Sequence, residues 1–240
     1  MQGNQTSFLK RGLKSFLGLF MTPSQVASIE KLSENFVQVE LSGSPIEKAK
    51  WTPGGKIQID VGGLKFRTFT PLRFGGKEGR LTIIGYRRPG HPATDWLDAL
   101  RVGEACEVFG PRDSLDFSRL EGNVALFGDE TSFGIARVLR GVIGPRAHIF
   151  LELNSLVEGR DVLARLGIEA AQTHERVADG AHLAALARGL IEKSGEFSTL
   201  FLTGRASSIQ RLRTLLKEAG VPGGKLKTRP YWADGKAGLD

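Results

Sequence analysis

The chain has 240 residues and a formal net charge of +7, with 25% charged and 40% hydrophobic residues. This balance is typical of globular proteins and excludes a wholly disordered chain or a coiled coil. The single cysteine, Cys106, excludes an internal disulfide and a cysteine-based zinc site, which favours a reducing compartment and predicts a cytoplasmic location. The modest positive charge indicates an anionic ligand rather than nucleic acid.

Residues 1–20 predict an amphipathic helix. Phe8, Leu13 and Phe20 fall on one helical stripe, and no acidic residue precedes Glu30. The apolar stretch is too short for a membrane span and too interrupted for a secretory signal. The helix therefore either packs on its own protein or on a subunit, or makes a peripheral contact with a membrane surface.

Residues 21–119 predict an antiparallel β-barrel, because short alternating strands follow one another with turn residues between them. In one of them, Ile57, Ile59 and Val61 alternate with polar residues. The expected strands are 26–32, 36–41, 57–61, 65–70, 81–84 and 107–109. Between the last two, Thr94 is expected to cap the N-terminus of a short helix over 94–100.

Residues 120–240 predict an α/β domain with a parallel sheet, since continuous apolar strands alternate with helices. The expected strands are 124–127, 149–151 and 200–202, and the expected helices are 132–140, 182–193 and 206–219. The boundary between the two domains falls at about residues 118–122.

Two turns of the α/β domain have a composition suited to phosphate. Residues 128–132, Gly-Asp-Glu-Thr-Ser, end the first strand and begin a helix, whose free N–H groups and dipole attract anions. Residues 203–205, Thr-Gly-Arg, end the third strand. Because both turns would face one crevice, they predict a nucleotide site. The alternative is that Thr131 or Ser132 only caps the helix.

One strand of the predicted barrel has the sequence Arg-Thr-Phe-Thr at residues 67–70. Arg67 and Phe69 share one face of this strand, while Thr68 and Thr70 share the other. A guanidinium can bind a phosphate with two N–H groups, and an aromatic ring can pack on a planar ligand. The same pattern also describes a surface arginine beside a core phenylalanine, so the tetrapeptide alone leaves both interpretations open.

Together, the motifs resemble those of the siderophore-interacting proteins, a branch of the ferredoxin-reductase-like flavoenzymes. They run in the family's order from about residue 21 to the C-terminus. The matching segments are 67–71 (Arg-Thr-Phe-Thr-Pro), 92–97 (Pro-Ala-Thr-Asp-Trp-Leu), 108–112 (Val-Phe-Gly-Pro-Arg), 128–131 (Gly-Asp-Glu-Thr) and 231–235 (Tyr-Trp-Ala-Asp-Gly).

The resemblance implies a ferredoxin-reductase-like fold, in which the barrel binds FAD and the α/β domain binds NADPH or NADH. It implies that a hydride passes from NADPH to FAD, and that single electrons then reduce a ferric siderophore or other ferric chelate and release iron(II). The alternatives are a general NAD(P)H:flavin reductase and a non-catalytic protein that binds flavin or a ferric chelate.

The resemblance also implies roles for individual residues. Thr70 would lie near the reactive edge of the flavin and is the expected catalytic residue. The implied FAD-binding residues are Arg67, Thr68, Phe69, Thr70, Pro92, Ala93 and Thr94. The implied NADPH-binding residues are Gly128, Asp129, Glu130 and Thr131, and the composition of the two phosphate turns adds Ser132, Gly204 and Arg205 as candidates. Trp232 would either cover the flavin or nicotinamide ring or anchor the C-terminal tail in the core.

Three positions depart from the family pattern. Phe69 replaces a tyrosine, which keeps the ring and loses the hydroxyl, and His91 replaces a glycine. Arg205 replaces a glutamate, and it either binds the 2′-phosphate of NADPH or lies in solvent.

An anionic ferric chelate would require a basic site. The candidates are Lys65, Arg73, Lys225, Lys227 and Arg229, which are either substrate-binding residues or a solvated basic edge. The four histidines show no metal-ligand spacing, so no metal site is expected in the protein.

Overall fold

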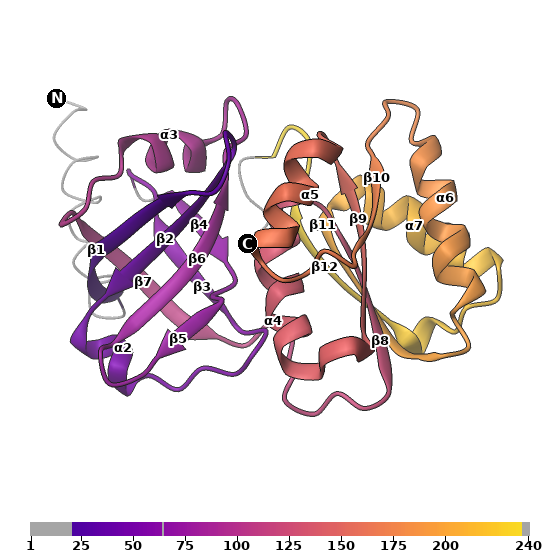
Figure 1. Cartoon of the computed structure of the whole chain (residues 1–240), viewed down its shortest axis with the longest axis horizontal. Helices are drawn as coiled ribbons and strands as arrows, with labels where there is room; N and C mark the ends of the chain where they lie inside the picture. The colour runs from indigo at the N-terminus through magenta and orange to yellow at the C-terminus, as the bar shows by residue number, and fades with distance from the viewer. Residues whose placement is uncertain (1–20, 64, 237–240) are drawn as a thin grey trace, which may run out of the picture.

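The computed structural model describes residues 21–63 and 65–236 (Figure 1), so the helix expected over residues 1–20 lies outside the described residues. The described chain forms an antiparallel β-barrel domain followed by an α/β domain, as the sequence predicts. Two helices of the α/β domain, α4 and α5, lie between its sheet and the barrel (Figure 1).

The barrel is one antiparallel sheet of seven strands in the order β4-β3-β7-β1-β2-β6-β5. Its elements are β1 (Met21–Lys31), β2 (Phe36–Ser42), α2 (Ser44–Lys48), β3 (Lys56–Asp60), β4 (Phe66–Phe69), β5 (Arg73–Gly75), β6 (Arg80–Tyr86), α3 (Pro92–Ala99) and β7 (Ala105–Arg112). Alternate apolar residues of these strands fill its interior, including Val39, Ile57, Ile83 and Val108, each fully buried. The alternation therefore predicted the barrel core correctly.

The expectation that Thr94 caps a helix was wrong. Helix α3 begins earlier, at Pro92, and His91 is its N-cap. Proline suits the first helical position because its fixed φ is helical and no partner is needed there for the missing N–H. The Thr94 hydroxyl instead donates to the backbone oxygen of Arg88 at 2.6 Å and accepts from its N–H at 2.7 Å.

The second sheet has five parallel strands in the order β10-β9-β8-β11-β12. The elements of this domain are β8 (Asn123–Gly128), η1 (Glu130–Ser132), α4 (Phe133–Ile143), η2 (Gly144–Arg146), β9 (Ala147–Leu153), α5 (Leu156–Arg165), β10 (Gln172–Glu175), α6 (Ala181–Glu192), β11 (Phe197–Arg205), α7 (Ala206–Glu218), η3 (Gly223–Lys225) and β12 (Leu226–Trp232). Helices α6 and α7 cover the face of the sheet that points away from the barrel (Figure 1).

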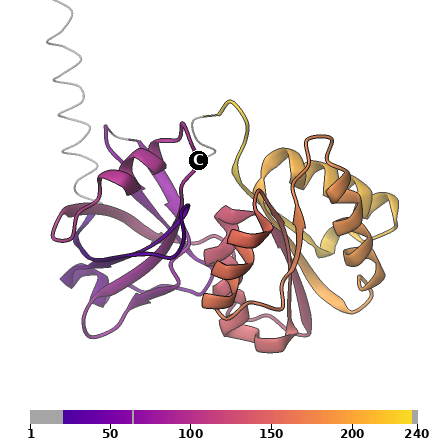
Figure 2. The ribbon, with the colours of Figure 1, turned by 45° about the horizontal axis from the view of Figure 1, so that its top comes forward.

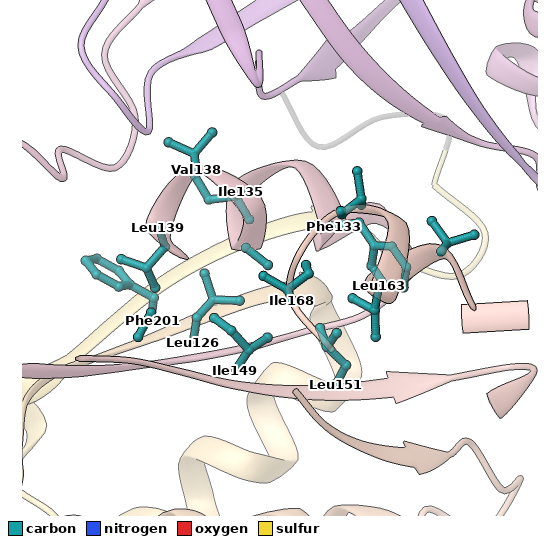
Figure 3. Close-up of a cluster of buried hydrophobic side chains, with 14 of the residues drawn as sticks. Leu126, Phe133, Ile135, Val138, Leu139, Ile149, Leu151, Leu163, Ile168 and Phe201 are labelled. Carbon is teal, nitrogen blue, oxygen red and sulfur yellow. The ribbon is translucent and has the colours of Figure 1, made fainter. Parts of the chain in front are cut away.

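Helix α4 joins the two domains. On one side Leu139 points toward Leu126 and Ile149 of the strands, while Val138 points the opposite way (Figure 3). The Phe133 ring stacks on Phe36 of the barrel with centroids 4.7 Å apart. This shared apolar core fixes the helix between the barrel and the sheet.

Gly134 brings the first turn of α4 against the end of strand β4. A Cβ at this position would lie 3.0 Å from the backbone oxygen of Thr70. The close approach favours glycine there. It sets the end of the Arg-Thr-Phe-Thr segment directly beside the carboxyl edge of the parallel sheet.

Candidate functional site

A cleft lies between the two domains at the carboxyl edge of the parallel sheet. From the barrel it is lined by residues 66–70, Tyr86, Arg88 and Ala93, and from the α/β domain by Thr131, Gly134, Tyr231 and Trp232. The structure thus brings together predicted residues from distant segments: Arg67, Thr68, Phe69, Thr70, Ala93, Thr131 and Trp232.

The barrel wall of the cleft carries positive charge. Arg67 is half-buried, donates to the backbone oxygen of Phe66 at 2.7 Å, and forms no ion pair within the described residues. Desolvation, followed by the charges of Arg88 and Arg67, lowers the pKa of His91. This wall therefore offers a guanidinium whose charge is not neutralised, which suits a phosphate group.

The start of helix α3 supports the same wall. Ala93 lines the cleft at the helix N-terminus. Thr94 is not among the residues that line the cleft. Its hydroxyl makes two hydrogen bonds to the backbone of Arg88 and so fixes the loop that contains this arginine. Phe69 packs its ring on Trp96 of α3 with centroids 6.0 Å apart, so it lines the cleft and supports the barrel at once.

The turn at residues 128–132 makes its hydrogen bonds internally. The N–H and hydroxyl of Thr131 both donate to the carboxylate of Asp129, and the N–H of Ser132 donates to the backbone oxygen of Asp129 at 2.8 Å. The N–H groups of Thr131 and Ser132 are therefore not among the free N–H groups expected for this turn, because Asp129 caps it. Only Thr131 of this turn lines the cleft.

Two glycines allow this turn to pack on the end of β11. A Cβ on Gly204, where φ is +91°, would lie 2.5 Å from the Asp129 carboxylate, and one on Gly128 would lie 2.4 Å from Ser132 Cβ. The Thr203 hydroxyl donates to the backbone oxygen of Phe127 at 2.8 Å, and a hydrogen bond of 2.9 Å joins it to the Ser132 hydroxyl. The predicted residues Gly128, Ser132 and Gly204 thus build the wall behind the cleft.

Trp232 is held at the cleft by three groups. Its indole N–H donates to Asp129 at 2.8 Å, and the guanidinium of Arg88 lies 3.4 Å from the ring centroid. Arg205 lies on the same ring at 5.4 Å and donates two hydrogen bonds to Asp234, at 2.9 and 2.7 Å. The segment after β12 therefore reaches from the parallel sheet toward the barrel, as Figure 2 shows.

Behind this turn lies a buried charge network that was not predicted from the sequence. Arg176 donates to Glu130 at 3.0 Å, and its Nε lies 3.6 Å from Glu152, which is fully buried. Glu152 also lies 2.7 Å from His182 Nε2. Burial, together with the charge of Glu130, raises the pKa of Asp129 to about 6. The signal in the sequence was Glu152, a charge inside an otherwise apolar strand.

Tyr231 fixes the side chain of Thr70 across the domain boundary. A side-chain hydrogen bond joins the two residues, and burial raises the pKa of Tyr231 to about 12. The phenol therefore stays protonated over the working range of an enzyme.

The predicted substrate residues do not gather at the cleft. Lys225 donates to the backbone oxygen of Ser194 at 3.1 Å, at the amino end of β12, and Lys227 is exposed beside it. Lys65 precedes β4, Arg229 lies midway along β12, and Arg73 lines a different groove. Within residues 21–63 and 65–236, no three metal-binding side chains cluster, and no helix is long and apolar enough to span a membrane.

The fold and the cleft define a class: a barrel joined to a parallel α/β domain, as in ferredoxin reductases. A ferredoxin reductase in carbazole 1,9a-dioxygenase, solved in an FAD apo form, has a TM-score of 0.68 to this chain with 15% identity. The match covers 88% of this chain and 66% of that one.

Other similar structures carry a more specific name. A siderophore utilization protein from T. fusca is 22% identical, with a TM-score of 0.73, and the match covers 92% of this chain and 95% of that one. The siderophore-interacting protein SipS from Aeromonas hydrophila is 17% identical, with a TM-score of 0.72, covering 90% and 94%. No curated protein sequence matches the chain.

The family model described as siderophore-interacting protein matches residues 122–235. The match agrees with the family resemblance of the sequence motifs over this part of the chain.

Proposed function

We propose that this protein is an FAD-dependent NAD(P)H oxidoreductase that reduces a ferric siderophore or another ferric chelate, with NADPH as the expected reductant. The observation that carries the proposal is the cleft, which sets the Arg-Thr-Phe-Thr segment against the carboxyl edge of a parallel sheet. The matched family and the ferredoxin-reductase fold support a flavin-dependent reductase. The names of the similar structures support a siderophore as the source of iron.

The barrel wall fits FAD. Arg67, without an ion pair among the described residues, would bind a flavin phosphate, and Ala93 at the N-terminus of α3 would face the pyrophosphate. Phe69 offers a ring face to the planar part of the cofactor. Arg88, which was not predicted from the sequence, adds a second positive charge at the same wall.

Thr70 would lie at the reactive edge of the flavin, and Tyr231 would hold its hydroxyl in place. The tyrosine hydroxyl keeps its proton, so this pair acts as a neutral hydrogen-bonding unit rather than as a base. FAD held on this wall would supply the redox chemistry, the exchange of a two-electron hydride for single electrons.

The sheet wall would receive NADPH or NADH. On this wall Thr131 and Trp232 line the cleft, while residues 128–130 and 204 shape the turns behind them. Trp232 presents its indole beside the Arg-Thr-Phe-Thr segment, and Arg88 orients the ring. We expect this tryptophan to control which ring reaches the flavin from the sheet side.

The test is a turnover assay on the full chain with NADPH, FAD and ferric citrate, in which iron(II) is trapped by a coloured chelator. The proposal predicts NADPH oxidation and iron(II) formation in a ratio of one to two, because a hydride carries two electrons. An Arg213→Gln variant, which removes one exposed positive charge on α7, serves as the control for a change in net charge.

The alternatives give different results in the same assay. A general flavin reductase would reduce added FAD at the same rate with and without the iron chelate. A non-catalytic binding protein would bind flavin or ferric citrate and oxidise no NADPH. Either result would reject the proposed ferric-chelate reductase.

A further inference from the structure

A second groove lies between the two domains, separate from the cleft. Its rim carries three arginines, each from a different element: Arg73 from β5, Arg137 from α4 and Arg165 from α5. We call it the arginine groove. Its floor is apolar, with Trp51 and Val138, and its volume is about 640 Å³.

The arginine groove and the cleft lie on two sides of one thin wall. Thr70 lines the cleft and Leu72, two residues on, lines the groove. Helix α4 repeats this arrangement, since Gly134 lines the cleft and Val138 lines the groove. Four residues along a helix span about 6 Å, so a ligand in the groove would lie close to one in the cleft.

The charges on the rim are unbalanced. Arg73 and Arg137 are exposed and form no ion pair within the part of the chain that the structure describes. Arg165 forms an exposed pair with Asp161 at 3.2 Å. No aspartate or glutamate is among the residues that line the groove. The two guanidinium groups without an ion pair, with no carboxylate lining the groove, create a positive potential and offer paired N–H donors to oxyanions.

The floor of the groove is apolar and includes a fixed aromatic ring. The Trp51 ring is fixed, because its N–H donates to the backbone oxygen of Gly55 at 3.1 Å and its face stacks toward Phe74, with centroids 6.3 Å apart. Val142, which also lines the groove, is 41% exposed. An apolar floor under a cationic rim suits a ligand with an apolar body and charged oxygens.

We propose that the arginine groove binds a compact polyanion that carries several carboxylate, phosphate or catecholate oxygens on a small apolar body. Such a ligand has two sources: a free polyanion, or the same oxygens arranged around iron(III). In the second case the groove is a docking site for the ferric substrate, which rests on the proposed function. The binding itself does not rest on it.

The test is an equilibrium titration of the full chain with citrate and, separately, with ferric citrate, followed by calorimetry and by tryptophan fluorescence. Trp51 is the tryptophan that lines the groove, whereas Trp232 lines the cleft. The Arg73→Gln/Arg137→Gln double variant should bind at least about tenfold more weakly, since each substitution removes a charge-assisted contact. Arg213→Gln should bind as the wild type does.

The fluorescence change should be lost in Trp51→Phe while calorimetric binding remains. Equal binding of citrate and ferric citrate would identify a free polyanion as the ligand, and a preference for ferric citrate would identify the chelate. Equal affinity of the wild type and the double variant would overturn the proposal, as would the absence of binding by both probes. Neither outcome depends on flavin or NADPH, so the proposed function would be unaffected.

Discussion

The two walls of the cleft differ in whether their polar groups already have partners within the protein. On the barrel wall, Arg67 keeps its charge without an ion pair among the described residues. On the sheet wall, the polar groups of Asp129, Thr131 and Ser132 bond to one another, and Asp129 also accepts from Trp232. A wall with an unneutralised charge gains more by binding a phosphate than one whose hydrogen bonds are complete. We therefore expect the barrel wall to hold a resident cofactor and the sheet wall to bind its ligand transiently.

The largest expected effect is the loss of stability when the packing of the sheet wall is disrupted at Gly204. In Gly204→Ala, the new Cβ would lie 2.5 Å from the Asp129 carboxylate at a φ of +91°. Strain and overpacking together should lower the free energy of unfolding by about 2–4 kcal/mol, as measured by urea denaturation.

The matched control is Gly220→Ala, where φ is +82° and no atom lies within 4 Å of the new Cβ. It should cost only about 1 kcal/mol, from the backbone conformation alone. Equal losses in the two variants would show that the turns are not packed as described.

The next effect concerns the barrel wall. Arg67→Ala should weaken FAD binding by about 1.5–3 kcal/mol, because a charge-assisted hydrogen bond to phosphate is lost. Calorimetry with FAD measures this directly, and Arg213→Gln controls for the change in net charge. An unchanged FAD affinity in Arg67→Ala would remove this residue from the flavin site.

Trp232→Phe tests the link between the walls. It removes the N–H that donates to the buried Asp129 and leaves that carboxylate with one partner fewer. The free energy of unfolding should fall by about 1–2 kcal/mol, while FAD affinity stays unchanged. A loss of FAD affinity as large as that of Arg67→Ala would contradict the division between the walls.

A pH effect follows from Asp129. Burial raises its pKa from 3.8 to about 6, so the folded protein binds its proton more tightly than the unfolded chain does. Its contribution to stability is therefore complete below about pH 4 and is lost as the pH rises through about 6. The difference in unfolding free energy between the wild type and Asp129→Asn, measured across this range, should move against the wild type as the pH rises. A constant difference would show that the carboxyl has an ordinary pKa.

The smallest effect is expected at Arg205. Its charge already pairs with Asp234 in a partly exposed position. Arg205→Gln should change stability by less than about 1 kcal/mol. It should also leave the KM for NADPH and for NADH nearly unchanged. A selective rise in the KM for NADPH would instead assign Arg205 to the 2′-phosphate.

The sequence predicted the elements that bury an apolar pattern and missed those that do not. Strand β10, Gln172–Glu175, has four residues without apolar alternation, and it is a strand because β9 pairs with it. Strand β12 contains Pro230 and basic residues, which an edge strand tolerates. Helix α5 was missed as well, because its apolar residues do not form one buried stripe: Val162 and Leu163 are buried, whereas Val157 is exposed.

The same contrast holds for the site. Residues 67–70 and Trp232 could be predicted because short motifs carry them. Arg88 could not, because its role depends on a tertiary contact with Trp232 and on the hydrogen bonds that Thr94 makes to its backbone. The internal capping by Asp129 was equally hidden, since the same residues fit a phosphate turn and a closed one.

The measurement that tests the central claim most directly is the absorbance spectrum of the purified full chain with FAD, before and after anaerobic addition of NADPH. We expect a protein-bound flavin spectrum that NADPH bleaches and that ferric citrate restores. A chain that binds no flavin, or a bound flavin that neither NADPH nor NADH bleaches, would contradict the assignment of the cleft.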